Sequence, residues 1–416
     1  MREMKDSGIE WVGDIPQDWQ LSKIGSLYTQ RNEKVSDKDY QPLSVTMQGI
    51  LPQLATAAKT DDGDNRKLVR VGDFAINSRS DRRGSCGISP LDGSVSLINI
   101  ILTPRTAMHP GYYNWLFHTT LFADEFYKWG HGIVADLWTT RWQEMKSITV
   151  PVPEYAEQER IAAFLDAECA EIDAVLEKTR ASIEEYKKLK QAVITQAVTK
   201  GIRGDRPMKD SGIEWIGAIQ KDWGSNTIAQ LCSQVKCKNT GLQEKNLLSL
   251  SYGKVKRKSI DTVEGLLPES FDGYNIIEKD DIVLRLTDLQ NDHTSLRVGL
   301  AEERGIITSA YLTIRNRSNM CTKYLYYYLH SFDIAKGFYG MGAGVMQGLN
   351  WDGVKWLKVL VPSVSEQEHI VAFLDAESEK LDALIAKKQQ YLSEIENYKK
   401  SLIYEYVTGK KEVHPL

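Results

Sequence analysis

The chain has 416 residues, which is more than one hydrophobic core usually supports and suits two domains with connecting elements. Hydrophobic residues make up 42% and charged residues 26%, as in ordinary globular proteins. The net charge of −4 argues weakly against nucleic acid as a partner, and five scattered cysteines argue against a disulfide framework or a zinc site. We expect a cytoplasmic protein, because no apolar run approaches the roughly 20 residues of a membrane span and the N-terminus lacks the apolar core of a signal peptide.

The first block of the chain occurs twice. Met4–Trp11 returns letter for letter as Met208–Trp215, and a later block, 157–168, closely matches 366–377. The long stretches between these blocks hardly resemble each other. The sequence therefore predicts one frame built twice around two different inserts.

The two inserts cover roughly Leu27–Pro151 and Leu231–Pro362, and both have a mixed α/β pattern. β-branched and aromatic runs between Gly-Asp and Asp-Gly turns predict strands, and aromatic stretches after them predict helices. In the first insert the predicted strands are 68–79 and 95–103, and the predicted helix is 112–127. In the second insert the predicted strands are 276–287 and 306–315, and the predicted helix is 323–338. Because the order is the same, we expect both inserts to share one fold.

Each insert leads into a long helix. Over Glu157–Thr199 apolar positions recur every seven residues, without Pro or Gly inside. The positions are Leu165, Ile172, Thr179, Tyr186 and Val193, and 209 residues later they are Leu374, Leu381, Lys388, Ile395 and Leu402. The second helix thus has one polar break, at Lys388, and Ser365 with Glu368 predicts a capping box at its start.

A narrow apolar stripe on each helix calls for a partner, and the other helix is the obvious one. The chain order predicts an antiparallel coiled coil, with the inserts at opposite ends and pseudo-two-fold symmetry. The predicted class is α+β: a first mixed α/β domain (1–153), a spacer helix (154–201), a second domain (202–362) and a second spacer helix with a tail (363–416). The alternative is two surface helices, each packed on its own domain.

No motif of a catalytic site is present. The chain has no phosphate-binding loop and no Pro-Pro pair, so the usual amino-methyltransferase motif is missing. The glycine cluster 340–344 lacks the strand-turn-helix context of a nucleotide loop, and the histidines show no metal-ligand spacing. We therefore expect neither catalytic residues nor a metal in this chain.

Polar clusters in the inserts point to DNA. Arginine binds guanine in the major groove with two hydrogen bonds, and Ser, Thr, Asn and Gln reach phosphates or base edges. After a predicted strand of the first insert the candidates are Arg79, Ser80, Arg82, Arg83 and Ser85; at the same place in the second they are Arg285, Thr287, Gln290, Asn291 and Arg297. The basic run Lys254, Lys256, Arg257 and Lys258 suits phosphates, and Gln347 and Asn350 lie ahead of a tryptophan before the second helix. Each cluster could instead be a solvated loop, and the tryptophans could pack at the joint between insert and helix.

Together these features resemble the specificity subunit of a type I restriction-modification system. The resemblance rests on Ser7–Gly13 and its copy Ser211–Gly217, on the helix starts Gln158–Asp166 and Gln367–Asp375, and on their duplication around two dissimilar inserts. It implies that each insert is a target recognition domain, which reads one half of a split, asymmetric DNA site. The helices would set the gap between the halves.

The resemblance also implies partners. Two modification subunits would methylate adenine with S-adenosylmethionine, and two restriction subunits could add ATP- and Mg-dependent cleavage; this chain would bind none of these cofactors. The repeated helix starts would dock the modification subunits through Ile161, Phe164, Leu165, Ile370, Phe373 and Leu374, unless these residues form the seam of the helix pair. Two alternatives stay open: a coiled-coil scaffold without sequence specificity, and a nuclease hidden in an insert.

Overall fold

The computed structural model describes residues 2–53, 62–132, 138–204, 206–258, 270–289, 292, 296–339, 341 and 348–413. The chain divides into two compact units, Met1–Arg180 with Gln390–Leu416, and Ala181–Gln389. Each unit holds one mixed α/β domain, which we call its head (Met4–Val152 in unit 1 and Met208–Val361 in unit 2). Each unit also holds the first part of one long helix and the last part of the other. The boundary therefore crosses both helices, whereas the sequence-based division placed its boundaries at helix ends.

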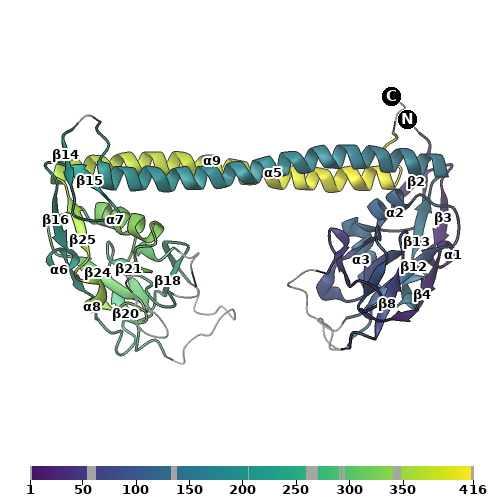
Figure 1. The fold of residues 1–416 in the computed structure, drawn as a ribbon, viewed down its shortest axis with the longest axis horizontal. Coiled ribbons are helices and arrows are strands. Elements are labelled where there is room, and N and C mark those ends of the chain that lie inside the picture. Colours follow the sequence, from purple (N-terminus) through teal and green to yellow (C-terminus); the bar gives the residue numbers. More distant parts are fainter. Residues whose placement is uncertain are drawn as a thin grey trace. The chain divides into compact units, whose positions relative to one another are not determined.

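The head of unit 1 is a mixed α/β domain (Figure 1). Its elements are β1 (Met4–Asp6), β2 (Asp14–Pro16), β3 (Gln20–Lys23), α1 (Ile24–Leu27), β4 (Tyr28–Arg31), β5 (Lys34–Val35), β6 (Leu43–Thr46), β7 (Gly49–Pro52), β8 (Arg66–Val69), β9 (Phe74–Asn77), η1 (Ser80–Arg82), β10 (Cys86–Ile88), β11 (Gly93–Val95), β12 (Asn99–Pro104), α2 (Pro110–Phe117), α3 (Thr120–Lys128), α4 (Trp142–Met145) and β13 (Thr149–Val152). The central antiparallel sheet has the order β10-β9-β12-β4, with Ile100 opposite Ile76. Buried aromatic side chains of α2 and α3 pack against it.

The head of unit 2 repeats this construction. It contains β14 (Met208–Asp210), β15 (Ala218–Gln220), β16 (Gly224–Thr227), α6 (Ile228–Leu231), β17 (Cys232–Gln234), β18 (Leu248–Ser251), β19 (Lys254–Arg257), β20 (Asn275–Ile277), β21 (Ile282–Leu284), β22 (Val298–Leu300), β23 (Gly305–Ile307), β24 (Leu312–Asn316), α7 (Thr322–Ile334), α8 (Trp351–Val354) and β25 (Lys358–Val361). Its central sheet has the order β17-β24-β21-β22, with Ile282 opposite Ile314. The two dissimilar inserts thus share one arrangement, as the sequence predicts.

Local turns divide three of the predicted elements. The stretch 68–79 is two strands, because Gly72 turns the chain with a φ of +86° between β8 and β9. Likewise Asp280, with a φ of +70°, separates β20 from β21. The predicted helix 112–127 breaks at Thr119, whose hydroxyl caps α3 by accepting from the backbone N–H of Phe122. Period-2 and period-3.6 patterns identify the elements, but single turn residues decide where they end.

The long helices are α5 (Tyr155–Lys200) and α9 (Val364–Val407). Helix α9 begins before the predicted cap, so Ser365 lies inside it. Ser363 takes that role instead, since its hydroxyl accepts from the N–H of Glu366 at 3.3 Å. No helix in the described part of the chain combines the length and apolarity that crossing a bilayer requires.

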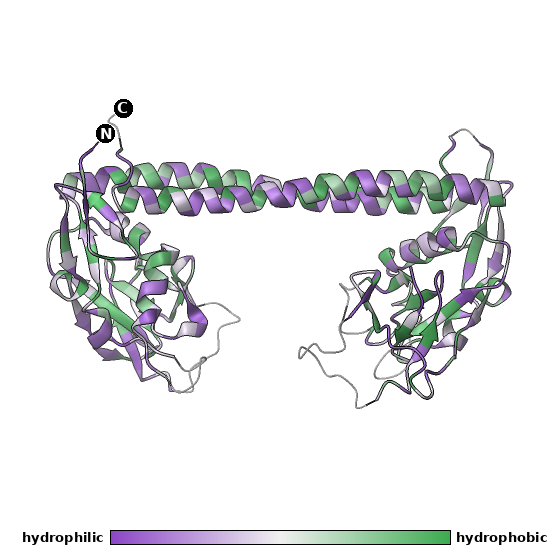
Figure 2. Ribbon diagram, turned by 180° about the vertical axis from the view of Figure 1, so that it is seen from behind, coloured by the Kyte–Doolittle hydropathy of each residue, from purple (hydrophilic) through white to green (hydrophobic). Residues whose placement is uncertain are grey.

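Within each unit the two helices run antiparallel. In unit 1, Lys399 pairs with Asp173 at 2.6 Å and Arg180 with Glu396 at 2.5 Å. In unit 2, Lys190 pairs with Asp382 at 2.7 Å, and the ammonium of Lys388 lies 5.6 Å from the ring centre of Tyr186. Residue numbers rise on α5 as they fall on α9, which confirms the predicted pairing (Figures 1 and 2). The predicted polar break at Lys388 is accommodated by this aromatic contact.

A repeated glutamine connects each head to the start of its long helix. In unit 1, Gln158 accepts from the N–H of His109 and donates to the carbonyl of Pro153. In unit 2, Gln367 makes the same two bonds, with Cys321 and Pro362. The glutamine is buried in both places, and its amide oxygen and its amide nitrogen are each hydrogen-bonded. This part of the repeated block is therefore kept by hydrogen bonding within each unit.

Candidate nucleic-acid interface

The loop after β9 is held firmly at its base. Tyr127 on α3 donates its hydroxyl to the carbonyls of Asn77 and Arg82, at 3.1 and 3.3 Å. The Asn77 side chain accepts from the N–H of Arg79 at 3.0 Å. Because these contacts fix the backbone, the exposed side chains of the loop start from defined positions.

Three arginines leave this loop toward solvent. Arg79 and Arg82 are exposed, and Arg83 pairs with Asp124 and lies over the ring of Tyr127. Ser80 is half-buried, whereas Ser85 is 5% exposed and begins the return to β10. The burial of Ser85 argues against its predicted contact with DNA.

A basic hollow of about 390 Å³ opens beside the loop. Among the described residues that line it, the charged ones are the cations Lys67, Arg79 and Arg141. Lys67 donates to the carbonyl of Asn99 at 2.7 Å, and burial lowers its pKa. The two arginines are left as the outward donors, an arrangement suited to a phosphate group.

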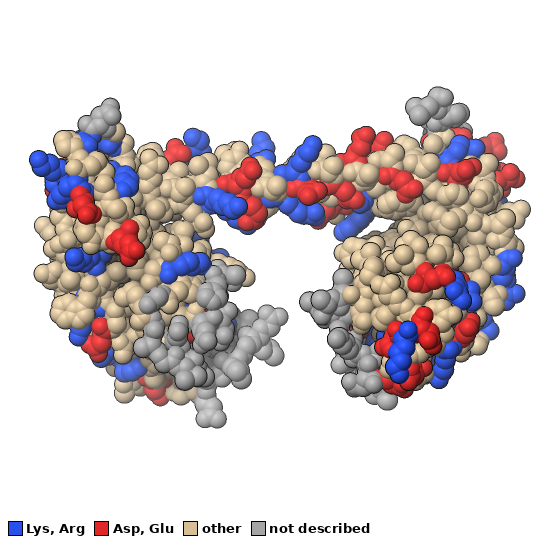
Figure 3. Space-filling model, viewed as in Figure 1, with Lys and Arg blue, Asp and Glu red and all other residues tan. Residues whose placement is uncertain are grey.

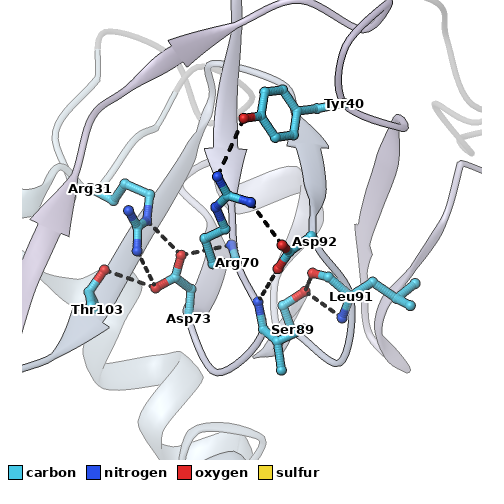
Figure 4. A network of polar contacts seen from close by, with 9 residues as sticks. Arg31, Tyr40, Arg70, Asp73, Ser89, Leu91, Asp92 and Thr103 are labelled. Atoms are coloured by element: carbon cyan, nitrogen blue, oxygen red, sulfur yellow. Dashed lines mark hydrogen bonds and ion pairs between the residues drawn. The ribbon is translucent and has the colours of Figure 1, made fainter.

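A polar network positions β9, and with it the loop (Figure 4). The buried carboxylate of Asp73 accepts from Arg31 at 2.7 and 3.2 Å, from the hydroxyl of Thr103 at 2.9 Å and from the N–H of Arg70 at 2.9 Å. The hydrogen bond to Asp73 raises the pKa of Arg31. Arg70 itself pairs with Asp92 at 2.8 Å. The turn that starts β9 is thus fixed by charge-assisted bonds.

At the corresponding place in unit 2 the predicted Arg297 has a structural role. It is fully buried, and its guanidinium donates to the carbonyls of Arg285 at 3.0 Å, Thr287 at 2.8 Å and Asp288 at 3.2 Å. Arginine has five donors and no acceptor, which suits a group of carbonyls around one turn. The assignment of Arg297 to DNA contact is therefore wrong; it shapes the loop after β21 from inside.

The other predicted residues of this loop differ in position. Thr287 is exposed, and Arg285 is half-buried and lies 3.5 Å from the carboxylate of Asp292. Gln290, Asn291 and Gln347 lie outside the described residues. Asn350 is exposed, but its side chain caps α8 by accepting from the N–H of Gly353 at 3.2 Å.

The predicted basic run forms one strand of a hairpin, β18–β19. Its apolar face buries Leu248 and Leu250, so Lys254 and Lys256 share the opposite face with two serines. Lys254, Lys256 and Lys258 are exposed, whereas Arg257 makes a two-point ion pair with Glu303. All four cations of this run are exposed, but Arg257 is partly neutralised by Glu303.

The tips of two corresponding hairpins carry residues that the sequence reading missed. Tyr252, between β18 and β19, is 88% exposed, and Met47, between β6 and β7, is 66% exposed. Tyr252 and Gly253 both have positive φ, at +48° and +74°, as a type I′ turn requires. Both side chains are therefore accessible to a ligand at these tips. The Tyr-Gly pair between two alternating runs was the available signal for the second hairpin.

The predicted docking residues are mostly core. Ile161 and Leu165 belong to the core of unit 1, and Ile370 and Leu374 to that of unit 2. Their burial in the cores favours the alternative structural role for these four residues over partner docking. Phe164 is half-buried against Tyr406, whereas Phe373 is 39% exposed.

Acidic and basic side chains are mixed over the visible face of both heads and along the helices (Figure 3). In the described part of the chain no group of three or more His, Cys, Asp or Glu residues could hold a metal ion. The basic hollow and the lysine face of the hairpin are thus local features on a nearly balanced surface.

Comparison with known proteins identifies the fold. Neither a protein-family model nor a curated protein matches the sequence. A chain solved in work on "complex assembly and conformational transition of the type I R-M system" matches with a TM-score of 0.71 and 13% identity, over 95% of this chain and 99% of that chain. The HsdS subunit from Thermoanaerobacter tengcongensis gives a TM-score of 0.49 at 15% identity (95% and 98% covered), and the type I S subunit from M. genitalium 0.36 at 15% (94% and 96% covered). The chain therefore has the fold of a type I restriction-modification component, as the resemblance implied.

Proposed function

We propose that this chain is the DNA-reading specificity subunit of a type I restriction-modification complex, in which each head reads one half of a split site. The observation that carries the proposal is the pair of heads with one strand order but different polar loops at the same place. Two heads with the same fold need different loop residues in order to read two different half-sites. The shared fold with a type I restriction-modification component supports this function.

In unit 1 the loop after β9 would enter the DNA groove. Arg79 and Arg141, beside the basic hollow, would hold the phosphate backbone, and Arg82 would reach base edges. Ser80 and Arg83 flank this contact. The exposed Met47 would meet apolar base surface, such as a thymine methyl group.

In unit 2 the lysines of β19 would hold phosphates, with Lys254 and Lys256 on one face and Lys258 next to it. Tyr252 at the hairpin tip would contact a base by stacking or by its hydroxyl. Thr287 and Arg285 would complete the surface, and Gln290, Asn291 and Gln347 stay proposed contacts.

The helices would set the gap between half-sites and dock the modification subunits. Helix α5 has 46 residues, which corresponds to about 69 Å of helix. Exposed apolar residues lie at equivalent positions of the two helices, Val175 and Leu384, and Leu189 and Tyr398. These four residues and Phe373, not the buried ones, would form the docking surface. Methyl transfer, and ATP-driven cleavage where restriction subunits are present, would belong to the partners.

The test is a map of methylated adenines by single-molecule sequencing, in cells with and without this chain. We expect a split motif with a fixed gap that disappears on deletion and returns with the wild-type gene. An unchanged map would refute the proposal. Footprinting of the complex separates the alternatives: a scaffold without specificity protects no preferred sequence, and a nuclease cleaves DNA without partner subunits.

A further inference from the structure

The ends of the two helices are equivalent but carry different side chains. Tyr112 donates its hydroxyl to the carbonyl of Val407 at 2.8 Å, and Tyr324 donates to that of Val198 at 3.2 Å. These bonds place Val407 and Val198 at the same point of the two units. The preceding residues therefore correspond as well: Tyr406 in unit 1 and Ala197 in unit 2.

In unit 1 this place is filled. The ring of Tyr406 packs on the ring of Phe164, with centres 4.4 Å apart and planes tilted by 39°. Aromatic pairs at such distances add about 0.5–1.5 kcal/mol to the burial of their surface. In unit 1, Tyr406 near the end of α9 thus covers Phe164 near the start of α5.

In unit 2 the same place is open. Phe373, the equivalent of Phe164, is 39% exposed, and a hollow of about 540 Å³ lies over it because alanine replaces the tyrosine. Ile202 and Met208, 36% and 45% exposed, also line the hollow. Unit 2 therefore presents an apolar site of the kind that a ring fills in unit 1.

The rim of this hollow is basic. Among the described residues that line it, the charged ones are Lys200, Arg203 and Arg206. Lys200 is held by the carbonyl of Ile216 at 2.8 Å, and Arg206 by Glu366 at 3.1 Å. Arg203 is exposed. Because Glu366 partly neutralises Arg206, the positive charge beside the apolar floor comes mainly from Lys200 and Arg203. It favours an occupant with negative charge next to its ring.

We propose that the unit 2 hollow binds an aromatic side chain flanked by carboxylates, presented by a partner protein. The ring packs on Phe373 as Tyr406 packs on Phe164, and the carboxylates meet the basic rim. Because Tyr406 covers Phe164 at the equivalent place in unit 1, this site distinguishes unit 2 from unit 1. A partner segment of this kind binds once per chain.

Methyl NMR of the full chain tests the proposal directly. The chain is labelled at its methionine methyl groups, the Met208 signal is assigned with Met208→Leu, and acetyl-Asp-Tyr-Asp-amide is titrated in. We expect a saturable shift of the Met208 signal. Acetyl-Asp-Ala-Asp-amide and acetyl-Lys-Tyr-Lys-amide should bind at least about tenfold more weakly, the equivalent of about 1.4 kcal/mol.

Two variants locate the binding. Ala197→Tyr fills the hollow and should abolish the shift with an unchanged or raised Tm; Phe373→Ala removes an exposed ring and should weaken binding at least about tenfold. Tyr391→Ala removes an exposed ring of the same helix outside the hollow; it is the matched control and should bind as the wild type. If Ala197→Tyr does not fold, the loss of binding in Phe373→Ala tests the site.

The proposal is overturned if the wild type shows no saturable shift of the Met208 signal, or if the shift survives in the folded variants. Neither DNA nor modification subunits enter this assay, so its failure leaves the proposed function untouched.

Discussion

The indole nitrogen of Trp19 donates a hydrogen bond to Oε2 of Glu157 over 2.9 Å, and Trp223 makes the same bond to Glu366 over 3.2 Å. Each tryptophan recurs eight residues after the end of the first repeated block, and each glutamate begins the second block. Both tryptophans are 1% exposed, so an unpaired indole N–H would be costly. The two repeated blocks are thus tied to each other within each unit, which explains why they recur together.

This tie predicts the effect of removing Glu157. Glu157→Ala leaves the Trp19 N–H unpaired and removes a carboxylate partner of Arg2, whose pKa that partner raises. We expect a loss of about 2 kcal/mol in the free energy of unfolding, measured by chemical denaturation. Glu159→Ala, on an exposed position of the same helix, should change it by less than about 0.5 kcal/mol. Equal effects of the two variants would show that the bond contributes nothing.

The buried carboxylates of Asp73, before β9, and Asp281, before β21, are paired with arginines on different strands. We predict that the arginine in unit 1 can be moved to the strand that supplies it in unit 2. Asp73 is paired with Arg31 on β4, whereas Asp281 is paired with Arg315 on β24, the strand that corresponds to β12. The strand registers place Arg315 at the position of Thr103. Arg31→Val should cost about 2 kcal/mol of unfolding free energy, and adding Thr103→Arg should restore at least half of it.

The matched control for this exchange is Thr103→Arg alone, which should not stabilise the chain because Arg31 already fills the site. A double variant as unstable as the sum of the single variants would contradict the shared arrangement.

The buried guanidinium of Arg297 predicts a large effect of its loss. Arg297→Met leaves several carbonyls of the loop after β21 without a donor, and we expect a loss of about 3 kcal/mol in unfolding free energy. Arg285→Ala, from the half-buried surface of the same loop, should cost less than about 1 kcal/mol. Equal stability of Arg297→Met and the wild type in denaturant titrations would refute this role.

Asp333 predicts a pH-dependent stability. Burial raises the pKa of this carboxyl to about 6, while its Oδ2 accepts from the N–H of Arg297. Because the folded pKa lies above the unfolded one, the protonated acid favours folding, and this contribution is lost as the pH rises through 6. Asp333→Asn keeps the acceptor without the charge. It should therefore gain about 1 kcal/mol relative to the wild type between pH 5 and pH 7.5, by denaturation at both values. A difference that does not change with pH would contradict this assignment.

Much of the frame could be predicted from the sequence because its signals are periodic or repeated. The seven-residue spacing predicted α5 and α9, and the single polar break at Lys388 still left enough apolar positions for the pair. The sites of single turns could not be read this way, since Gly72 and Asp280 divide strands through local backbone conformation.

The candidate interface was harder to predict because composition does not show burial. Arg79 and Arg297 look alike in a sequence, yet one is exposed and the other is fully buried among carbonyls. The helix-start residues Ile161 and Ile370 were predicted as docking residues because they repeat. They repeat because each fills the core of its unit.

The central claim is that each head reads one half of the DNA site. The most direct test replaces the insert 27–151 with the corresponding insert of a related chain and maps methylated adenines in cells by single-molecule sequencing. The account predicts that one half of the split motif changes, while the other half and the gap stay the same. A motif in which both halves change, or neither does, would contradict it.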